Sequence, residues 1–192
     1  KLSDADLRDA NLGAVNFTLA ALTKADLSNS NLKKAQLVGA KLNEAKLIKS
    51  DLRGANLTDV ILLGAVLISS KLIDSNLSNS NLFGANLSKA DLSHANLSDG
   101  NLTEALLTRA NLSMANLSKA NLTNATVSKA NLSKAKLNGA NLTGSNLSEA
   151  NFAGADLTMA NLKQADMLGV ILCNSILPSG DTTFSGCHLH NK

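Results

Sequence analysis

A leucine returns every five residues along almost the whole chain, and this period constrains the fold more than any other feature. Counted in fives from Lys1, residues 1–180 form 36 consecutive pentads without an insertion, and Leu holds the second place in 32 of them. Ala holds the fifth place in 24 pentads, and Asn or Asp holds the first place in 23. The third and fourth places are mostly Ser, Thr, Lys, Gly and Asp. Each pentad therefore supplies one large and one small apolar residue at fixed positions.

This period excludes both common regular structures. Five residues turn an α-helix by about 140° beyond a full circle, so successive leucines would lie on every face. On a flat strand, an odd step places successive leucines on opposite faces. All of them can point inward only if the chain turns regularly around an axis, as in a solenoid. We therefore expect an all-β solenoid whose coils stack at the ~4.8 Å spacing of neighbouring strands.

The run ANLSKADLSHANLSDGNL, residues 85–102, resembles the pentapeptide-repeat family, whose pattern is A(N/D)LXX. The resemblance covers residues 1–180 and implies a right-handed quadrilateral β-helix (the repeat-five-residue fold), with four pentads per coil. It also implies that the Leu and the small residue lie inside and that the other three places face outward. About nine coils would make a rod ~43 Å long. Ser30, Ser50 and Ser70, which replace Ala at intervals of 20 residues, independently support a 20-residue coil.

The pentad pattern ends in GDTTFSGCHLHNK, residues 180–192. We therefore divide the chain into a β-helix, residues 1–180, and a C-terminal cap or tail, residues 181–192. Phe184 and Pro178 are expected to lie over the last coil. The pattern is already running at Lys1, so either a preceding cap covers that rod end or the end is an interface.

Two cysteines, Cys173 and Cys187, lie close to this C-terminal segment. A disulfide between them would pin the cap, and this is the reading we favour. Two free thiols, or a metal site completed by His188 and His190, are the alternatives, because such spacing is a weak metal signal. The pair does not decide between the cytoplasm and the thylakoid lumen or periplasm. The family resemblance implies a bacterial, especially cyanobacterial, origin or a plastid derived from one.

The sequence predicts no enzyme and no cofactor. Asp4, Glu44 and Glu104 share one column but stand two or more coils apart, and His94 is expected on the surface among Ser and Lys. Acid–base catalysis needs groups that converge in a pocket, which a filled rod lacks. Asn residues 20 apart are expected to stack as a ladder instead: Asn81, Asn101, Asn121, Asn141 and Asn161. The longest apolar run, residues 60–68, is too short for the ~20 residues of a membrane span.

Two outward-facing sets of residues stand out as candidate contact surfaces. The apolar patch comprises Ile48, Ile61, Leu63, Val66, Ile68, Ile73 and Phe83. Such a patch often marks a contact, although outward aliphatic residues also favour extended backbone. The basic stripe comprises Lys46, Lys49, Lys89, Arg109 and Lys129. It would suit an anionic partner or serve as a solvated face that discourages aggregation.

We therefore expect a non-catalytic scaffold that binds a protein partner, or forms a homodimer, through the apolar patch or a rod end. The family resemblance adds an alternative, because some members mimic DNA and bind DNA gyrase. That role needs a negative surface and, in several members, projecting loops. This chain has a net charge of +3 and unbroken register, so we disfavour it and expect no direct binding to nucleic acid.

Overall fold

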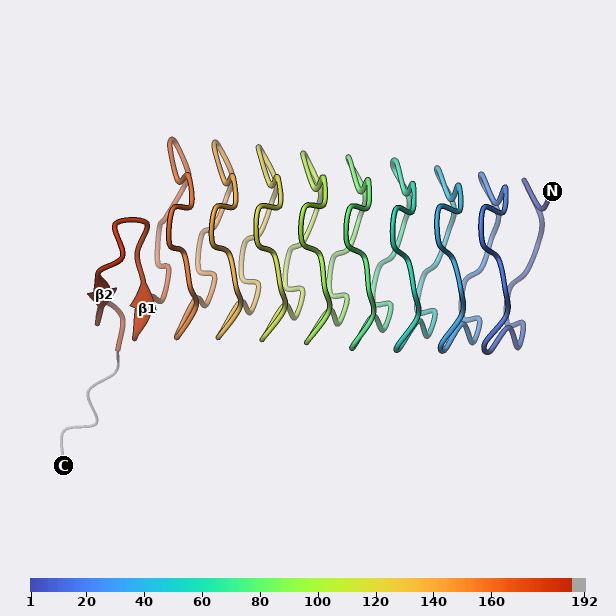
Figure 1. The fold of residues 1–192 in the computed structure, drawn as a ribbon, viewed down its shortest axis with the longest axis horizontal. Helices are drawn as coiled ribbons and strands as arrows, with labels where there is room; N and C mark the ends of the chain where they lie inside the picture. The colour runs from blue at the N-terminus through green and yellow to red at the C-terminus, as the bar shows by residue number, and fades with distance from the viewer. Residues whose placement is uncertain (188–192) are drawn as a thin grey trace, which may run out of the picture.

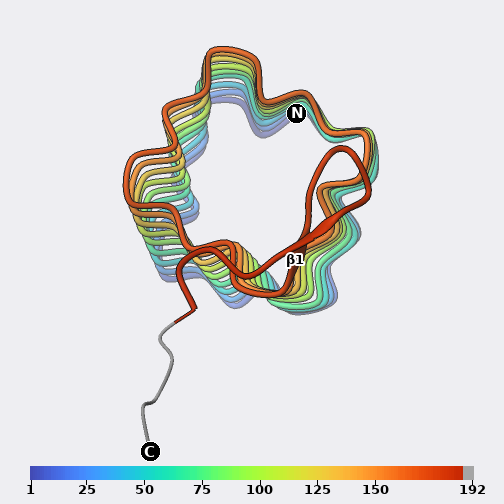
Figure 2. The same cartoon turned by 90° about the vertical axis from the view of Figure 1, so that its left-hand side faces the viewer.

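The computed structural model describes residues 1–187 and shows a straight rod of stacked coils (Figure 1). First-place residues form parallel bridges with residues 20 further along, from Asp6 with Asp26 to Asp156 with Ile176. Viewed along the axis, the coils superimpose in a four-sided outline (Figure 2). Four pentads therefore complete one coil, as the sequence predicts.

Each pentad makes one side of the coil and one corner. The fifth, first and second places run along the side, and the third and fourth places form the turn. Every fourth-place residue from Asp4 to Asn174 has a φ between 54° and 69°. This left-handed conformation is the one that a type II turn requires at its third residue. We number sides and corners from Lys1: the second side contains Val66, between the first corner (Leu63 and Gly64) and the second corner (Ile68 and Ser69).

Residues 91–95 show how a pentad satisfies its backbone. The N–H of Leu92 donates to the carbonyl of Asn111 (2.7 Å), and the N–H of His94 donates to the carbonyl of Ser113 (3.0 Å), both in the next coil. The first-place N–H donates to the coil before, and the Ala95 N–H closes the turn on the Leu92 carbonyl (3.0 Å). Only the third-place N–H is left without a backbone acceptor.

A first-place Asn or Asp supplies that acceptor. The Oδ1 atom of Asp91 accepts the N–H of Ser93 at 3.1 Å, and the same contact recurs along the rod. Because a buried or half-buried N–H is costly to leave unpaired, this bond explains why Asn and Asp dominate the first place. It is an Asx turn repeated once per pentad.

The second and fifth places form the interior. Leu and Ala side chains are fully or almost fully buried from Leu22 to Ala160, and Phe152 is accommodated among them with 1% exposure. Fifth-place serines are buried as well, and the Oγ of Ser50 donates to the Leu47 carbonyl at 2.7 Å. The interior residues of the first coil are only half-buried, because nothing in residues 1–187 stacks on its outer face, and most of those in the last coil are half-buried because residues 181–187 cover only part of it.

A short hairpin follows the last complete coil. Strand β1 (Ser175–Ile176) pairs antiparallel with β2 (Thr182–Thr183) (Figure 1). The Pro178 carbonyl accepts the Met159 N–H at 3.0 Å, the bond that third-place carbonyls make along the rod, so Pro178 continues the repeat and is not part of a separate cap. Phe184 differs from expectation: it is 69% exposed and does not cover the core. Counted in fives, it still occupies a fourth place, which faces outward in every coil.

Candidate interaction surface

The basic stripe lies on one part of the rod. Lys46 is in the middle of the second side, and the other four residues occupy the fourth place of the second corner. All five side chains are exposed. Lys129 forms an ion pair with Glu149 of the next coil, at 3.4 Å. The stripe therefore ends at an acid on its C-terminal side.

The apolar patch divides between several sides. Five of its residues lie on the second side and its two corners: Ile48, Leu63, Val66, Ile68 and Phe83. Ile61 lies in the middle of the first side, and Ile73 lies on the third corner, so the patch wraps around the rod instead of lying on one face. Phe83 is 42% exposed, and the other six residues are half-buried.

Leu106 extends the apolar surface and was missed in the sequence. It lies on the second side, two coils beyond Val66, and it is 40% exposed. The bridges Val66 with Asn86 and Asn86 with Leu106 place the three residues in one column. The signal was present, since Leu106 takes the first place, where Asn or Asp is usual.

Two pentads of the apolar patch lack the third-place hydrogen bond, as do other pentads that begin with neither Asn nor Asp. Ile61 and Val66 replace the first-place Asn or Asp, so they cannot accept the N–H of Leu63 and Ile68. No protein group within residues 1–187 accepts either N–H. At the first place of these two pentads, the apolar side chains thus remove a turn-stabilising hydrogen bond that most pentads keep.

Two glycines leave Leu63 and Phe83 uncovered at the first corner. Gly64 and Gly84 occupy the fourth places that follow these residues. A Cβ atom on Gly84 would have no atom within 4 Å, and one on Gly64 would meet only the Glu44 Cγ, at 4.0 Å. The first corner therefore has no side chain beyond the backbone at the two positions that follow its largest apolar residues.

Charge differs between the two corners that border the second side. Glu44 and Glu104 occupy fourth places of the first corner, one on each side of the glycines. Glu44 is 3.8 Å from the Nζ of Lys24 in the coil before. The second corner carries the four cations of the basic stripe at the equivalent fourth place. Over coils three to six, the second side therefore has Val66 and Leu106 in its middle beside Lys46 and Asn86, with glutamates along one edge and cations along the other.

No arrangement suited to catalysis occurs in the described part of the chain. Residues 1–187 contain no pocket and no group of three or more side chains suited to a metal ion. Asp4, Glu44 and Glu104 share the first corner but do not converge, and His94 is exposed on the third corner. Within the same residues there is also no helix of the length and hydropathy needed to cross a membrane.

The Asn column is hydrogen-bonded along the axis in two ways. Asn101 donates directly to the Oδ1 of Asn81, at 3.1 Å. Asn141 donates instead to the Oγ1 of Thr123, at 3.0 Å, and that hydroxyl donates to Asn121. Two of the four steps of this column are therefore hydrogen-bonded, and within residues 1–187 no such bond joins Asn101 to Asn121 or Asn141 to Asn161.

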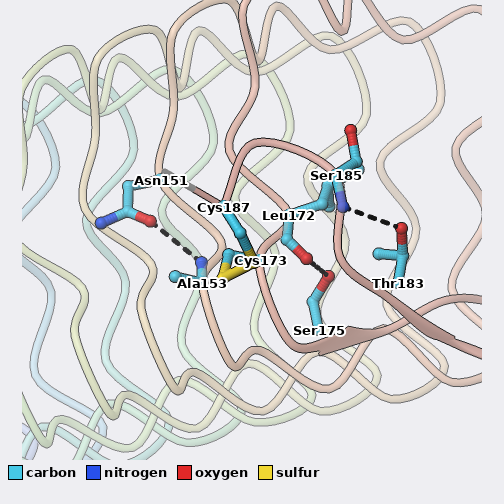
Figure 3. Close-up of a disulfide and its surroundings, with 8 residues drawn as sticks. All are labelled: Asn151, Ala153, Leu172, Cys173, Ser175, Thr183, Ser185 and Cys187. Atoms are coloured by element: carbon cyan, nitrogen blue, oxygen red, sulfur yellow. Dashed lines mark hydrogen bonds between the residues drawn. A yellow bond between two sulfur atoms is a disulfide. The ribbon is translucent and has the colours of Figure 1, made fainter. Parts of the chain in front are cut away.

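A disulfide joins Cys173 to Cys187 beside the hairpin (Figure 3). The two Cα atoms are 4.7 Å apart, and the residues are 14 positions apart in the chain. The Leu172 N–H donates to the Ser185 carbonyl at 3.1 Å, so a backbone bond supports the same junction. His188 and His190, the other residues of the alternative metal site, lie outside the described residues.

Comparisons with known proteins agree with this architecture. Eight copies of the family model described as pentapeptide repeats match residues 1–37, 35–67, 61–99, 101–139 and 140–177. Comparison with curated proteins finds no match.

Several solved structures are similar. One is HetL, a pentapeptide repeat protein involved in heterocyst differentiation regulation from the cyanobacterium Nostoc sp. strain PCC 7120. It is 37% identical, with a TM-score of 0.68 over 94% of this chain and 84% of HetL. QnrB1, a plasmid-mediated fluoroquinolone resistance protein, is 22% identical, with a TM-score of 0.67 over 81% of this chain and 87% of its own. Rfr23 from the cyanobacterium Cyanothece 51142 is 44% identical, with a TM-score of 0.44 over 44% of this chain and 58% of its own.

Proposed function

This chain belongs to the pentapeptide-repeat family, and we propose that it is a non-catalytic scaffold that binds another protein or a second copy of itself. The family and the similar structures imply a right-handed quadrilateral β-helix. Pentapeptide-repeat proteins are generally non-catalytic scaffolds. Our proposal takes the rod as about nine coils of four pentads, residues 1–180, followed by a C-terminal cap or tail, residues 181–192.

The departure of the apolar patch from the repeat pattern is the observation that carries this proposal. Ile61 and Val66 give up an Asx-turn bond, which contributes about 0.5–1.5 kcal/mol to stability when it is formed. They also place half-buried apolar side chains at positions of the rod surface where Asn or Asp is usual. Residues that break the local rules of a fold without a structural gain are expected at functional sites. A protein contact that buries these apolar side chains would offset the stability lost with the hydrogen bond.

The relative HetL supports a binding role. HetL is involved in the regulation of heterocyst differentiation, and regulation can proceed through binding alone. We draw only the class of activity from this likeness. DNA mimicry receives less support, because QnrB1 shows the fold alone at 22% identity and the present chain has a net charge of +3.

The mass of the protein in solution tests the proposal, and light scattering measures it directly. The first variant is Leu63→Asp/Phe83→Asp, which puts two carboxylates into the apolar patch. The matched control is Ser78→Asp/Ser98→Asp, which alters the third place of the fourth corner in the same two coils. We expect a wild-type mass near twice 19.9 kDa, a monomeric patch variant and a dimeric control.

Other results would redirect or contradict the proposal. A dimer that survives the patch variant would move the contact to a rod end. A monomeric wild type would contradict self-association and leave only a different protein as the partner. If the control also becomes a monomer, the loss of mass is not specific to the patch, and the patch has no assigned role.

A further inference from the structure

We propose that two copies of this chain pack side by side with their rods parallel, each using its second side. A two-fold axis would run along the rods, through the middle of the second sides. This inference rests on the proposed scaffold function and specifies its partner and geometry. It follows from the order of charges, glycines and apolar side chains along the two corners that border this side.

The corners are complementary under such an axis. The axis keeps each residue at its height along the rod and places the first corner of one copy against the second corner of the other. Glu44 then faces Lys49 of the second copy, and Glu104 faces Arg109 of the second copy. Each pair occurs twice in the dimer, because the contact is isologous. Complementary charges of this kind fix register and orientation more than they add affinity.

The same arrangement would place a lysine of the second copy beside the glycines of the first corner. Gly84 would lie opposite Lys89 of the second copy, and the space beside Gly84 is open. The aliphatic stem of that lysine could pack along Phe83 while its ammonium group stays in water. At the axis itself, Val66 and Leu106 would each meet their own counterparts.

An antiparallel dimer brings like charges together. An axis perpendicular to the rods, placed at the centre of the apolar surface, exchanges the coils that contain Glu44 and Glu104. Those two carboxylates would then face each other, and Lys49 would face Arg109 of the second copy. Juxtaposed like charges disfavour a wrong arrangement, so the pattern selects the parallel one.

The parallel arrangement also brings like charges together, since Asp6, Asp26 and Asp166 of the second side would each meet their own counterparts. Lys46 would approach its own counterpart at the axis, but each Lys46 lies beside Asp26 of the same chain, its partner in the bridge. The two lysines and the two aspartates of the dimer lie close together, and their charges sum to zero. In the first coil, Asp4 would face Asp9 of the second copy, with Arg8 between them, so the contact is expected to be closest around coils three to six.

A charge exchange between two chains tests this geometry. In a dimer of the Glu104→Arg variant, each introduced arginine faces Arg109 of the other copy, which makes two like-charge contacts. In a dimer of the Arg109→Glu variant, each introduced glutamate faces Glu104 of the other copy, which again makes two like-charge contacts. Mixing the two variants gives a heterodimer in which both contacts pair opposite charges. Both positions are exposed, so neither change is expected to prevent folding.

We expect sedimentation of each variant alone to show a dissociation constant at least tenfold above that of the wild type. The equimolar mixture should return to a dimer with nearly wild-type affinity. A wild-type monomer, single variants that dimerise normally, or a mixture that stays monomeric would each overturn the parallel dimer.

These outcomes are distinguishable from failure of the scaffold proposal. If Leu63→Asp/Phe83→Asp abolishes the dimer while the charge variants leave it intact, the apolar patch mediates self-association in another geometry. Circular dichroism of each variant checks that the coils have formed.

Discussion

At the scale of the residue, the fourth place of each pentad sets a conformational requirement that few residue types meet without cost. Its φ is positive from the first coil to the hairpin, although Lys, Glu and Met occupy it in several pentads. A non-glycine residue in the left-handed region costs roughly 1–2 kcal/mol, and only Gly, Asn and Asp visit it routinely. The corner turns are therefore held by the stacked coils and not by local preference.

Two glycine substitutions should accordingly change stability in opposite directions. Gly54 has a φ of 64°, and its added Cβ would make one ordinary contact, at 3.7 Å from Lys34. Gly54→Ala should lower the free energy of unfolding by about 1 kcal/mol. Gly13 takes a third place without a positive φ, and its added Cβ would make only ordinary contacts. Gly13→Ala should raise the free energy by about 0.4–1 kcal/mol. Urea denaturation measures both, and equal effects would contradict the backbone explanation.

Replacing two buried serines by alanine should change the free energy of unfolding in opposite directions. The Oγ of Ser80 is buried and has no hydrogen-bond partner, whereas the Oγ of Ser50 donates to the Leu47 carbonyl at 2.7 Å. Ser80→Ala should stabilise the protein by about 1 kcal/mol, because an unpaired buried hydroxyl is costly. Ser50→Ala should destabilise it by a similar amount. The two midpoints in urea provide the test, and a loss of stability in Ser80→Ala would indicate a partner for that hydroxyl.

One ion pair predicts a dependence on pH. Hydrogen bonds from the Arg53 side chain lower the pKa of Asp51 to about 2, and its backbone N–H and the nearby Lys33 act in the same direction. A lowered pKa stabilises the folded state above the unfolded value near 4, and this stability is lost as the pH falls from about 4 towards 2. Asp51→Asn should therefore cost about 2 kcal/mol at pH 6 and much less near pH 2. A difference between the two proteins that stays constant with pH would contradict this account.

Several of these residue-level features were within reach of the sequence. Eight of the twelve glycines occupy a fourth place, which already indicates a positive φ there. The excess of first-place Asn and Asp likewise reflects the third-place N–H that they accept. The position of Ile61 and Ile73 on other parts of the rod also follows from counting by 20. Exposure could not be predicted in this way, since outward third-place residues such as Ile68 are half-buried by neighbouring coils.

At the scale of the element, the hairpin of β1 and β2 depends on few interactions. Two residue pairs join its strands, and the disulfide and the Leu172–Ser185 bond fasten its base. The pentad pattern predicted neither strand, because residues 175–183 continue the repeat in part and leave it only at Gly180. The solvent-exposed Phe184 shows that this segment closes the rod end only partly.

Removal of the disulfide should therefore loosen the hairpin without unfolding the rod. In Cys173→Ser/Cys187→Ser, the loss of a 14-residue closure weakens the hairpin by up to ~3 kcal/mol. Coils in a solenoid contact only their neighbours, so the effect should not reach the middle of the rod. Hydrogen exchange should accelerate at the Leu172 amide and stay unchanged at the Leu92 amide. Equal acceleration at both amides would show that the disulfide stabilises the whole rod.

At the scale of the whole molecule, the four sides have the same interior and different exteriors. Every side presents Leu or a similar residue and a small residue inward, so the core does not distinguish one side from another. The exterior does: over coils three to six, the second side has Val66 and Leu106 between an acidic first corner and a basic second corner. The interior pattern made the fold predictable, whereas the contact surface depends on which columns the 20-residue coil brings together.

Insertions between Ala95 and Asn96 test the packing of the interior separately from the contact surface. A five-residue insertion, Asn-Leu-Ser-Lys-Ala, keeps every Leu and Ala inward, so the rod should fold with nearly unchanged stability. It moves all later residues by one side, which takes Glu104 to the second corner and Arg109 to the third. A parallel dimer through the second side should then dissociate. A 20-residue insertion of four such pentads restores both residues to their original corners, and this longer chain should dimerise. Thermal denaturation measures the stability of the rod, and light scattering measures its dimerisation. If the variant with the five-residue insertion is unfolded, the interiors of the four sides are not interchangeable. If that variant folds and is still a dimer, the contact does not use these corners.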